Sequence, residues 1–537
     1  MTKFFRTGRG GWLGTALLVF LLAVLAHVGT LSGEFVLDDR PFLIDNPKMA
    51  DVARPPNFFS GGLWTFSNIP VGDDAIYRPF FVATLWLNNQ LWRGWPAGFH
   101  LYSLLLHGAT TLLLLMWLRR LLPGIDVRAA GLAAALFAVH PVHAEAVGWI
   151  LATMHLQATL LILATCLVHD RYLRTGQPAF LLVAAMLFGG AIFTAETGVV
   201  FPFFVLMQDR LRLGRWRFMA FSAYGAVLVV YLVARKILLG VSLPLTWDLA
   251  TAGARLPGFL VEYLRHLLLP WPQPLYLAMP DTGFFHLQSL PVAMFLVAAW
   301  AIPLVRMRPV PVVPLLALVW LGVFLAPPLA AVFNPSPLLA MRYVYLPSVG
   351  LSILLAWWLD RLPGKGWPHL ILPLLLFLPV TFMAHGHWQN DGEVYARIVQ
   401  WNPNHHAGYL GMARYAERSG NPERASHLYR QALTRATGKA RLTVLEPLAL
   451  LLGQTGDHAA SLALFRELTT LAPERSSAWV GVGNNLWFMK QPEQAAAAYA
   501  EAVRMDPRNR EACHNLRMAL TATGRLRDVP RVCFSGP

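Results

Sequence analysis

The chain has 537 residues, of which 56% are hydrophobic and 14% are charged, and its mean hydropathy is +0.47. These values exclude an ordinary soluble globular protein of this length and predict a chain that lies largely in a lipid bilayer. The formal net charge of +15 comes from short Arg and Lys clusters between apolar segments. Because these clusters do not form one basic face, we expect no nucleic-acid partner.

Apolar runs long enough to cross a bilayer recur through the first 390 residues. The first run, residues 12–31, follows Lys3, Arg6 and Arg9 and has no small-residue cleavage site, so we expect a spanning helix and not a signal peptide. The later runs are residues 101–118, 129–148, 149–168, 180–193, 198–207, 218–234, 290–305, 310–330, 344–359 and 369–383. By length they predict an all-α polytopic membrane bundle of about 11 spans.

The distribution of basic residues predicts the orientation of the bundle. If the N-terminus lies in the cytoplasm, the Arg and Lys clusters all fall in short inner loops, whereas the long acidic loop of residues 32–78 lies outside. The clusters assigned to the inside are Arg119, Arg120 and Arg128, Arg171 and Arg174, residues 210–217, Arg306 and Arg308, and Arg361 and Lys365. An odd number of spans then places the residues after Met383 on the side opposite the N-terminus. We therefore expect an inner-membrane protein whose C-terminal part lies in the periplasm.

The remainder of the chain is charged, rich in alanine and helical in period. Trp479, Gly483, Tyr499 and Pro507 fit the pattern of a tetratricopeptide unit, and Pro473 precedes Pro507 by about the 34 residues of one unit. Two earlier copies begin at Tyr409 and Leu445 and keep the same register. We therefore expect a membrane domain over residues 1–390 and a periplasmic α-solenoid over residues 391–537. Such a stack binds a peptide or protein partner, or serves as a passive spacer.

Two adjacent acids follow the first predicted span at the membrane–water boundary. A carboxylate at this position can take a proton from a hydroxyl nucleophile while a lipid-borne donor lies alongside, and Asp38 and Asp39 are the candidates. Neighbouring side chains point in different directions, so we expect one base and one supporting residue. The alternative is a pair of solvated loop acids.

Three further polar residues stand where the third predicted span ends, namely His140, His143 and Glu145. Polar groups at such a position are costly unless they are used, which favours headgroup or sugar binding over an ordinary interfacial cap. The spacing of the two histidines is not that of a zinc site. Glu196 lies between two short apolar segments, a pattern typical of broken helices that line a cavity, although a surface turn gives the same pattern.

Two arginines on the predicted outer side, Arg78 and Arg342, are candidates for binding a phosphate. A guanidinium can form forked hydrogen bonds to phosphate oxygens, although each could also be the partner of an acid or a snorkelling side chain. We assign Tyr343, which follows Arg342, to the same donor site.

The three cysteines have no metal-ligand spacing. No cofactor is expected, and a requirement for a divalent cation is left open. A bridge between Cys513 and Cys533 would need an oxidising compartment, and two free thiols are the alternative.

With these motifs in order, the chain resembles the transmembrane and tetratricopeptide repeat-containing O-mannosyltransferase-like family, within the C-type glycosyltransferase superfamily. The matching phrases are Phe35-Val-Leu-Asp-Asp, Tyr77-Arg-Pro, the Phe99-His to Leu106-His stretch, His140-Pro-Val-His-Ala-Glu, Glu196-Thr-Gly and Arg342-Tyr-Val-Tyr-Leu-Pro-Ser. The resemblance implies inverting transfer of mannose or another hexose from a polyprenyl-phosphate donor to Ser or Thr of an exported protein. It also implies that Asp38 is the base, with Asp39 beside it, and that Arg342 binds the donor phosphate.

The chain departs from the family pattern at a few positions. Ala195 stands where the family usually has Lys, Thr153 and His155 stand where it often has Arg and Asp, and Met341 replaces an expected Glu. A different sugar or a diverged, inactive member would explain these changes. Two rival hypotheses stay open, a non-catalytic membrane-anchored scaffold for envelope or pilus assembly, and a glycan polymerase or ligase.

Overall fold

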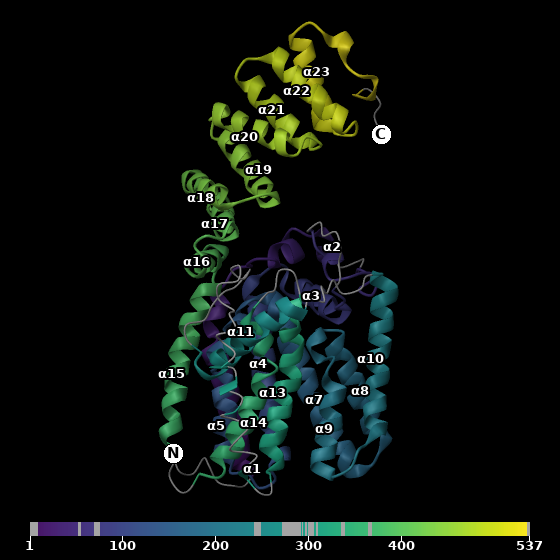
Figure 1. Cartoon of the computed structure of the whole chain (residues 1–537), viewed down its shortest axis with the longest axis vertical. Helices are drawn as coiled ribbons and strands as arrows, with labels where there is room; N and C mark the ends of the chain where they lie inside the picture. Colours follow the sequence, from purple (N-terminus) through teal and green to yellow (C-terminus); the bar gives the residue numbers. More distant parts are fainter. Residues whose placement is uncertain are drawn as a thin grey trace. The chain divides into compact units, whose positions relative to one another are not determined.

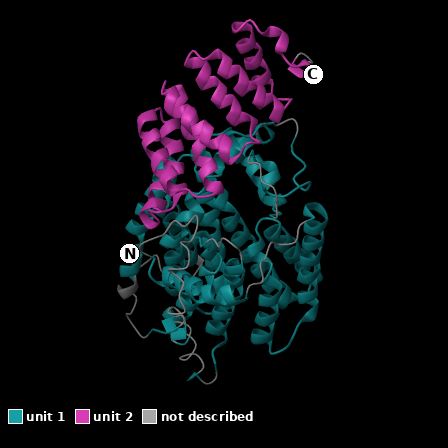
Figure 2. Cartoon of the chain, turned by 45° about the horizontal axis from the view of Figure 1, so that its top comes forward, with its two compact units in different colours: residues 1–394 teal, residues 395–537 magenta. Residues whose placement is uncertain are grey.

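The computed structural model describes residues 9–51, 55–68, 76–240, 249–270, 310–333, 339–362 and 368–533, with a few isolated positions between 291 and 307. Every regular element in these ranges is a helix, as the hydrophobic and repeat patterns predict. The chain divides into two compact units, Met1–Val394 and Tyr395–Pro537 (Figure 2). We call them the membrane unit and the repeat unit.

The membrane unit is a bundle of long helices connected by short helical turns (Figure 1). Its α-helices are α1 (Arg9–Ala26), α2 (Pro47–Ala50), α3 (Pro79–Trp92), α4 (Pro96–Leu121), α5 (Val127–Ala138), α6 (Ala144–Gly148), α7 (Thr153–Thr175), α8 (Pro178–Ile192), α9 (Phe201–Leu213), α10 (Phe218–Leu239), α11 (Leu249–Leu268), α13 (Val312–Leu329), α14 (Ser348–Leu359) and α15 (Pro368–His385). The short turns are η1 (Val28–Ser32), η2 (Arg40–Ile44), η3 (Trp64–Phe66), η4 (Pro141–His143), η5 (Ile150–Ala152), η6 (Glu196–Gly198), η7 (Ala330–Phe333), η8 (Met341–Val344) and η9 (Gly386–Trp388).

Within the described residues, 6 helical segments are long and apolar enough to cross a membrane, and a bent pair would make 7. The 6 segments are Gly10–Ser32, Pro96–Leu121, Ile150–Thr175, Phe218–Leu239, Val312–Phe333 and Ile371–Trp388. The chain is therefore a multi-pass membrane protein. Helices α8 and α14 are apolar but shorter, and the predicted span at 290–305 lies largely outside the described residues. The total of about 11 spans stays a prediction.

One predicted span differs from the expected straight helix. Residues 129–148 form α5 and then η4 with α6, and the two parts are bent by 44°. The break has a chemical cause, because Pro141 has no backbone N–H to continue the helical hydrogen bonds. His140 accepts a hydrogen bond from the backbone N–H of Val142 at 3.2 Å and so caps the second part.

The helices of the bundle differ in how much of their surface faces outward. In the most apolar 18-residue stretch of the span that contains α7, 78% is buried inside the protein, whereas the corresponding share is 17% for α10 and 22% for the span that contains α15. Large apolar side chains such as Leu13 on α1, Ile237 on α10 and Leu375 on α15 are exposed. Such outward apolar surfaces suit helices that contact lipid. Helix α7 is the buried centre of the bundle, and it packs against α4 and α8.

Residues 32–78, which we call the first loop, connect α1 to α3. Its short helices lie with α3 at one end of the bundle (Figure 1). Asn46 holds the loop together, because its side-chain amide donates to the carbonyl oxygens of Phe42, at 3.1 Å, and Phe66. Asn89 of α3 donates to the carbonyl oxygen of Met49 at 2.9 Å, which ties the loop to the helix that follows it.

The repeat unit consists of antiparallel helix pairs. Its helices, after α16 (Asp391–Trp401), which crosses the boundary between the units, are α17 (His406–Arg418), α18 (Pro422–Arg435), α19 (Lys439–Gln454), α20 (His458–Leu471), α21 (Ser476–Phe488), α22 (Pro492–Met505) and α23 (Arg510–Ala522), followed by the turns η10 (Leu526–Asp528) and η11 (Arg531–Cys533). Gly481 contacts the Phe465 ring and Gly483 the Tyr499 ring, so the small residues admit aromatic side chains of the paired helices. Cys513 and Cys533 form a disulfide.

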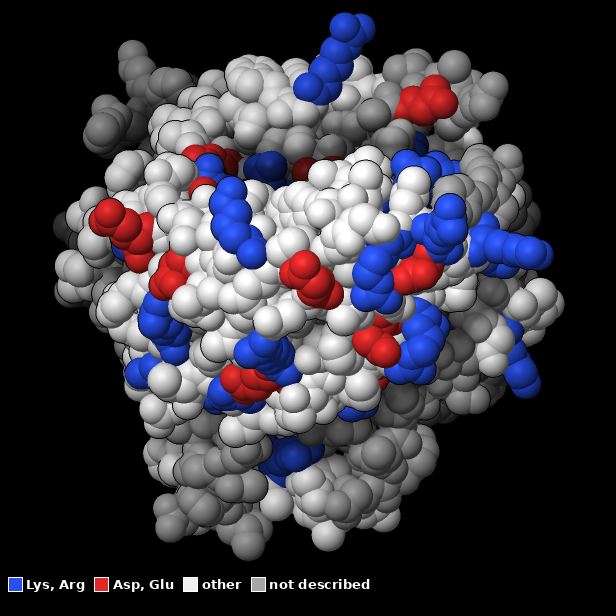
Figure 3. Space-filling model, turned by 90° about the horizontal axis from the view of Figure 1, so that it is seen from above, with Lys and Arg blue, Asp and Glu red and all other residues white. Residues whose placement is uncertain are grey.

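The surface of the repeat unit carries charges of both signs. Arg441 pairs with Glu467 at 2.6 Å, and Arg475 pairs with Glu446 at 3.0 Å. Figure 3 shows Lys and Arg side chains interspersed with Asp and Glu side chains on the face of the molecule that it presents.

Candidate functional site

The structure gives the two adjacent acids of the first loop different environments. Asp39 is fully buried, and its carboxylate accepts hydrogen bonds from the backbone N–H groups of Val36, at 3.1 Å, and Leu151, at 3.0 Å. Its two oxygens thus hold the loop in shape and join it to η5. Asp38 is half-buried, and no residue in the described part of the chain donates a hydrogen bond to its carboxylate. Of the two acids, Asp39 is thus the one whose carboxylate is bound to backbone N–H groups.

The electrostatic surroundings of Asp38 are mixed. Burial raises the pKa of its carboxyl, the positive charge of Arg342 lowers it, and the negative charge of Asp391 raises it further, with a net increase. Burial also raises the pKa of Asp39 well above its usual value, although the hydrogen bonds from Val36 and Leu151 oppose this change. A carboxyl whose pKa is raised is a better proton acceptor when ionised.

Arg342, in η8, contacts one carboxylate and two aromatic rings. Its guanidinium forms an ion pair with the buried carboxylate of Glu145, which also accepts the backbone N–H groups of Met341, at 2.8 Å, and Arg342, at 3.3 Å. The guanidinium lies 4.9 Å from the centre of the Trp149 ring and 4.7 Å from that of Tyr343. Such stacking fixes the plane of an arginine side chain. Although burial opposes it, Tyr343 and Glu145 raise the pKa of Arg342, so the side chain is a permanent cation.

Arg78 forms a second ion pair near the first. Its Nε and a terminal nitrogen each lie 2.7 Å from Oε2 of Glu196, and its other terminal nitrogen contacts the Met154 sulfur. His155, in α7, lies within electrostatic range of both Arg342 and Arg78. Its ring lies 5.3 Å from the ring of Tyr343. The structure therefore gathers Asp38, Arg342, Glu145, Tyr343, Arg78 and Glu196 into one polar cluster at the first-loop end of the bundle.

His140 and His143 have different surroundings. His140 lies 3.1 Å from the carbonyl oxygen of Leu267, and His143 lies 3.0 Å from the hydroxyl of Ser348. Both side chains are buried, and their neighbouring rings are those of His107, Phe137, Tyr345 and Phe377. In these positions they take part in helix packing inside the bundle, and the structure does not place them among the charged residues around Asp38.

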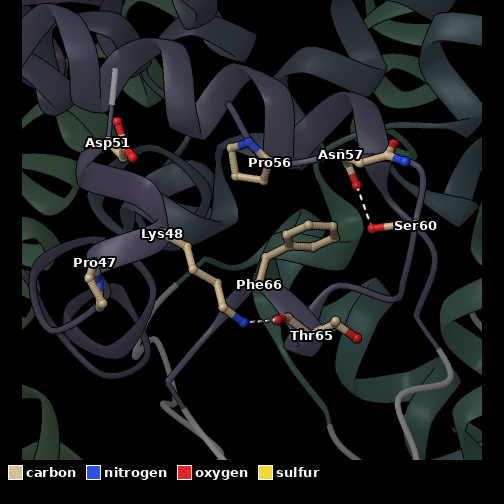
Figure 4. A pocket seen from close by; sticks show the side chains of 8 residues that line it. All are labelled: Pro47, Lys48, Asp51, Pro56, Asn57, Ser60, Thr65 and Phe66. Atoms are coloured by element: carbon tan, nitrogen blue, oxygen red, sulfur yellow. Dashed lines mark hydrogen bonds between the residues drawn. The ribbon is translucent and has the colours of Figure 1, made fainter. Parts of the chain in front are cut away.

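A pocket of about 480 Å³ opens in the first loop and is shown in Figure 4. Its lining residues are Pro47, Lys48, Asp51, Pro56, Asn57, Ser60, Thr65 and Phe66. The Lys48 ammonium donates to the carbonyl oxygen of Thr65 at 3.4 Å. None of the site residues predicted from the sequence lines this pocket.

No pattern in the sequence singles out Trp149 or Asp391. Trp149 stood at a predicted junction between two spans, and its place over Arg342 depends on the break that precedes α7. Asp391 was the first residue of a charged region, yet its carboxylate accepts the backbone N–H of Leu37 at 2.7 Å. In the described ranges, no group of three or more His, Cys, Asp or Glu side chains is arranged to hold a metal ion.

Comparison with known proteins supports both parts of the chain. The tetratricopeptide repeat model matches residues 476–509, which confirms the unit predicted from Trp479 to Pro507. Protein O-mannosyl-transferase Tmtc1 of Drosophila melanogaster is 30% identical over 190 residues, which are 35% of this chain and 21% of that protein. Protein O-mannosyl-transferase Tmtc2 of the same species is 35% identical over 162 residues, or 30% of this chain and 17% of that protein. The chain is homologous to the TMTC protein O-mannosyltransferases.

The matched region spans only about a fifth of the length of these TMTC relatives. Among solved structures, that of MamA matches with 15% identity and a TM-score of 0.25, covering 27% of this chain and 82% of MamA. The resemblance noted in the motifs is thus confirmed as homology over about a third of the chain.

Proposed function

We propose that the protein is a membrane glycosyltransferase that moves a hexose from a polyprenyl-phosphate donor to a Ser or Thr hydroxyl of an exported protein. One observation carries the proposal. The carboxylate of Asp38 has no hydrogen-bond donor in the described part of the chain and lies in the field of the fixed cation Arg342. A base without a partner beside a bound cation is the arrangement that attack on a phosphate-linked sugar needs.

Each group in the proposed reaction has one task. The ionised Asp38 takes the proton of the acceptor hydroxyl as the oxygen attacks the anomeric carbon from the face opposite the phosphate. The bond from the anomeric carbon to the phosphate oxygen breaks, its electron pair stays on the phosphate, and the sugar inverts. Arg342 stabilises the added negative charge on the leaving phosphate.

The contacts of Arg342 suit this task. Glu145 pairs with the guanidinium and the rings of Trp149 and Tyr343 lie within 5 Å of it, so these contacts restrict the direction of the N–H groups that remain. Donors fixed before the reaction need no reorganisation as charge develops. Where the relatives' pattern has Glu before the arginine, this chain has Met341, and Glu145 is the carboxylate that orients Arg342. Arg78 and Glu196 form the far wall of the same donor site.

The apolar tail of the donor needs an apolar surface. An apolar pocket of about 440 Å³ lies between α9 and α13, on a part of the bundle that begins at Val200, close in sequence to Glu196. Its lining residues are Val200, Phe203, Met207, Val319, Gly322, Val323 and Ala326. We assign the first prenyl units to this pocket, because burial of each methylene contributes about 0.8 kcal/mol.

The repeat unit would hold the acceptor protein. Helix-pair repeats of this kind form extended binding surfaces. The Cys513–Cys533 disulfide favours an oxidising compartment, which agrees with the periplasmic side that the positive-inside rule assigns to this part of the chain.

The experiment that tests the function compares the exported proteins of a wild-type strain with those of a strain lacking the gene, by intact mass and glycopeptide analysis. The proposal predicts at least one protein that loses hexose-sized increments in the deletion strain. A deletion phenotype with unchanged glycoforms would instead favour the scaffold, which the departures at Ala195, Thr153 and Met341 support.

A further inference from the structure

The segment of residues 385–391, which we call the junction segment, joins α15 to α16 and lies against the first loop. The backbone N–H of Glu34 donates to the carbonyl oxygen of Gln389 at 2.7 Å. The Gln389 side chain accepts from the Ser32 hydroxyl at 2.9 Å and donates to the carbonyl oxygen of Gly29 at 2.9 Å. Two segments separated by most of the membrane unit are thus paired beside the candidate base.

A further contact of the junction segment, made by Asp391, falls on a strained residue of the first loop. Leu37, immediately before Asp38, has a backbone φ of +51°, in the left-handed region. A bulky residue adopts this strained conformation only where its surroundings fix it. The backbone N–H of Leu37 donates to Oδ1 of Asp391 at 2.7 Å, and this bond is the fixing contact.

Asp391 is not needed for the task that its position suggests. It is the first residue of α16 and adjoins the cap position, where both Asp and Asn are favoured. Here the side chain of Asn390 accepts the backbone N–H of Glu393 at 3.0 Å and so provides the cap. The buried carboxylate of Asp391 therefore reaches across to Leu37.

The backbone on both sides of Asp38 is held while its own carboxylate has no donor. On one side Asp391 binds the N–H of Leu37, and on the other Asp39 binds the N–H groups of Val36 and Leu151. Two fixed neighbours set the direction of the Cα–Cβ bond of Asp38, and so limit where its carboxylate can lie. Because a misplacement of about 1 Å costs on the order of a hundredfold in rate, the direction of a base matters.

We propose that Asp391 is a positioning residue for Asp38, which holds Leu37 in the left-handed conformation and so aims the carboxylate of the base at the acceptor hydroxyl. This inference rests on the proposed transferase function. The charge of Asp391 has a second effect, because it opposes ionisation of Asp38. The charged groups that act on Asp38 are Arg342 from η8 and Asp391 from α16, and the adjacent Asp39 is coupled to it. His155 of α7 is in turn within electrostatic range of Arg342.

Three substitutions in the full chain, reconstituted in lipid vesicles, test the inference. The first is Asp391→Ala, which removes the acceptor for Leu37, and the second is Asp391→Asn, which keeps an acceptor oxygen without the charge. The third is Glu393→Ala, a matched control that removes an exposed carboxylate from the same turn of α16. The assay follows sugar transfer from polyprenyl-phosphate mannose to envelope proteins of the deletion strain, per folded protein.

We expect Asp391→Ala to lower kcat by about 10- to 100-fold with an unchanged KM for the donor. The carboxylate of Asp38 is then no longer held in position for the acceptor hydroxyl, whereas the donor site stays intact. Asp391→Asn restores most of kcat and moves the acid limb of the pH profile to lower pH, since loss of the negative charge lowers the pKa of Asp38. Glu393→Ala changes neither.

Equal rates for wild type and Asp391→Ala, or equal losses for the Ala and Asn variants with no movement of the pH profile, overturn the inference while the transferase function stands. The absence of transfer by the wild-type protein overturns both.

Discussion

The buried carboxylate of Glu145 holds Arg342 twice, through the guanidinium and through the backbone N–H of the same residue. The two residues lie far apart in the sequence, so this contact joins α6 to η8. The side chains are only 5% and 11% exposed. An ion pair so placed depends strongly on the presence of both partners.

Replacement of Glu145 by alanine should therefore destabilise the membrane unit. It leaves a buried guanidinium and two backbone N–H groups without their acceptor, and we expect the free energy of unfolding to fall by about 3–5 kcal/mol. Thermal unfolding of the purified protein in detergent measures the change. The control is Arg128→Ala, whose side chain is 55% exposed and 3.9 Å from its partner, with an expected loss of at most about 1 kcal/mol. Equal effects of the two variants would contradict a stabilising role for the buried pair.

Substitution of Arg342 by glutamine should change the pH dependence of transfer as well as its rate. The positive charge of Arg342 lowers the pKa of Asp38 against the effect of burial, so its loss raises that pKa further. Since the base must be ionised, the acid limb of the activity profile moves to higher pH, and kcat falls by about 100-fold or more. Initial rates over a range of pH test this expectation. Arg120→Gln, in the last turn of α4, serves as control. If the wild type, Arg342→Gln and Arg120→Gln all share one acid limb, the effect of Arg342 on the pKa of Asp38 is contradicted.

Much of the fold could be predicted from the sequence, because it depends on local patterns. Apolar length located the spanning helices, and the spacing of Gly483, Tyr499 and Pro507 located the repeat. The bend at Pro141 was missed, since hydropathy is the same on both sides of it.

The candidate site could be predicted only in part. Residue type and position at the end of a span singled out Asp38, Arg342 and Glu145, which the structure brings together. The different environments of Asp38 and Asp39 depend on the hydrogen bond from the N–H of Leu151 to Asp39, a contact between distant residues that no local pattern encodes. The same holds for Asp391 and Leu37. His140 and His143 are polar residues at the end of the same predicted span as Glu145, so the sequence does not distinguish them from it. Their burial depends on packing against α14 and α15.

The disulfide offers a test of orientation. If the repeat unit faces the periplasm, Cys513 and Cys533 are oxidised in cells and resist a thiol reagent until a reductant is added. Mass analysis of the alkylated protein should show two extra labelled thiols only after reduction. Cys166 is buried in α7 and stays unlabelled in the folded protein, which makes it an internal control. Free labelling of both repeat-unit cysteines in fresh cells would contradict the periplasmic assignment.

The central claim is that Asp38 is the base of a sugar transfer, and the most direct measurement is the glycoform distribution of exported proteins in strains that express Asp38→Asn or Asp45→Asn at matched membrane levels. Asp45 is an exposed acid of the same loop, so its substitution controls for loop charge. We predict that Asp38→Asn lowers transfer by about 10²- to 10⁴-fold with normal folding, so that the hexose increments disappear, whereas Asp45→Asn leaves them intact. Full glycosylation in the Asp38→Asn strain would contradict the account.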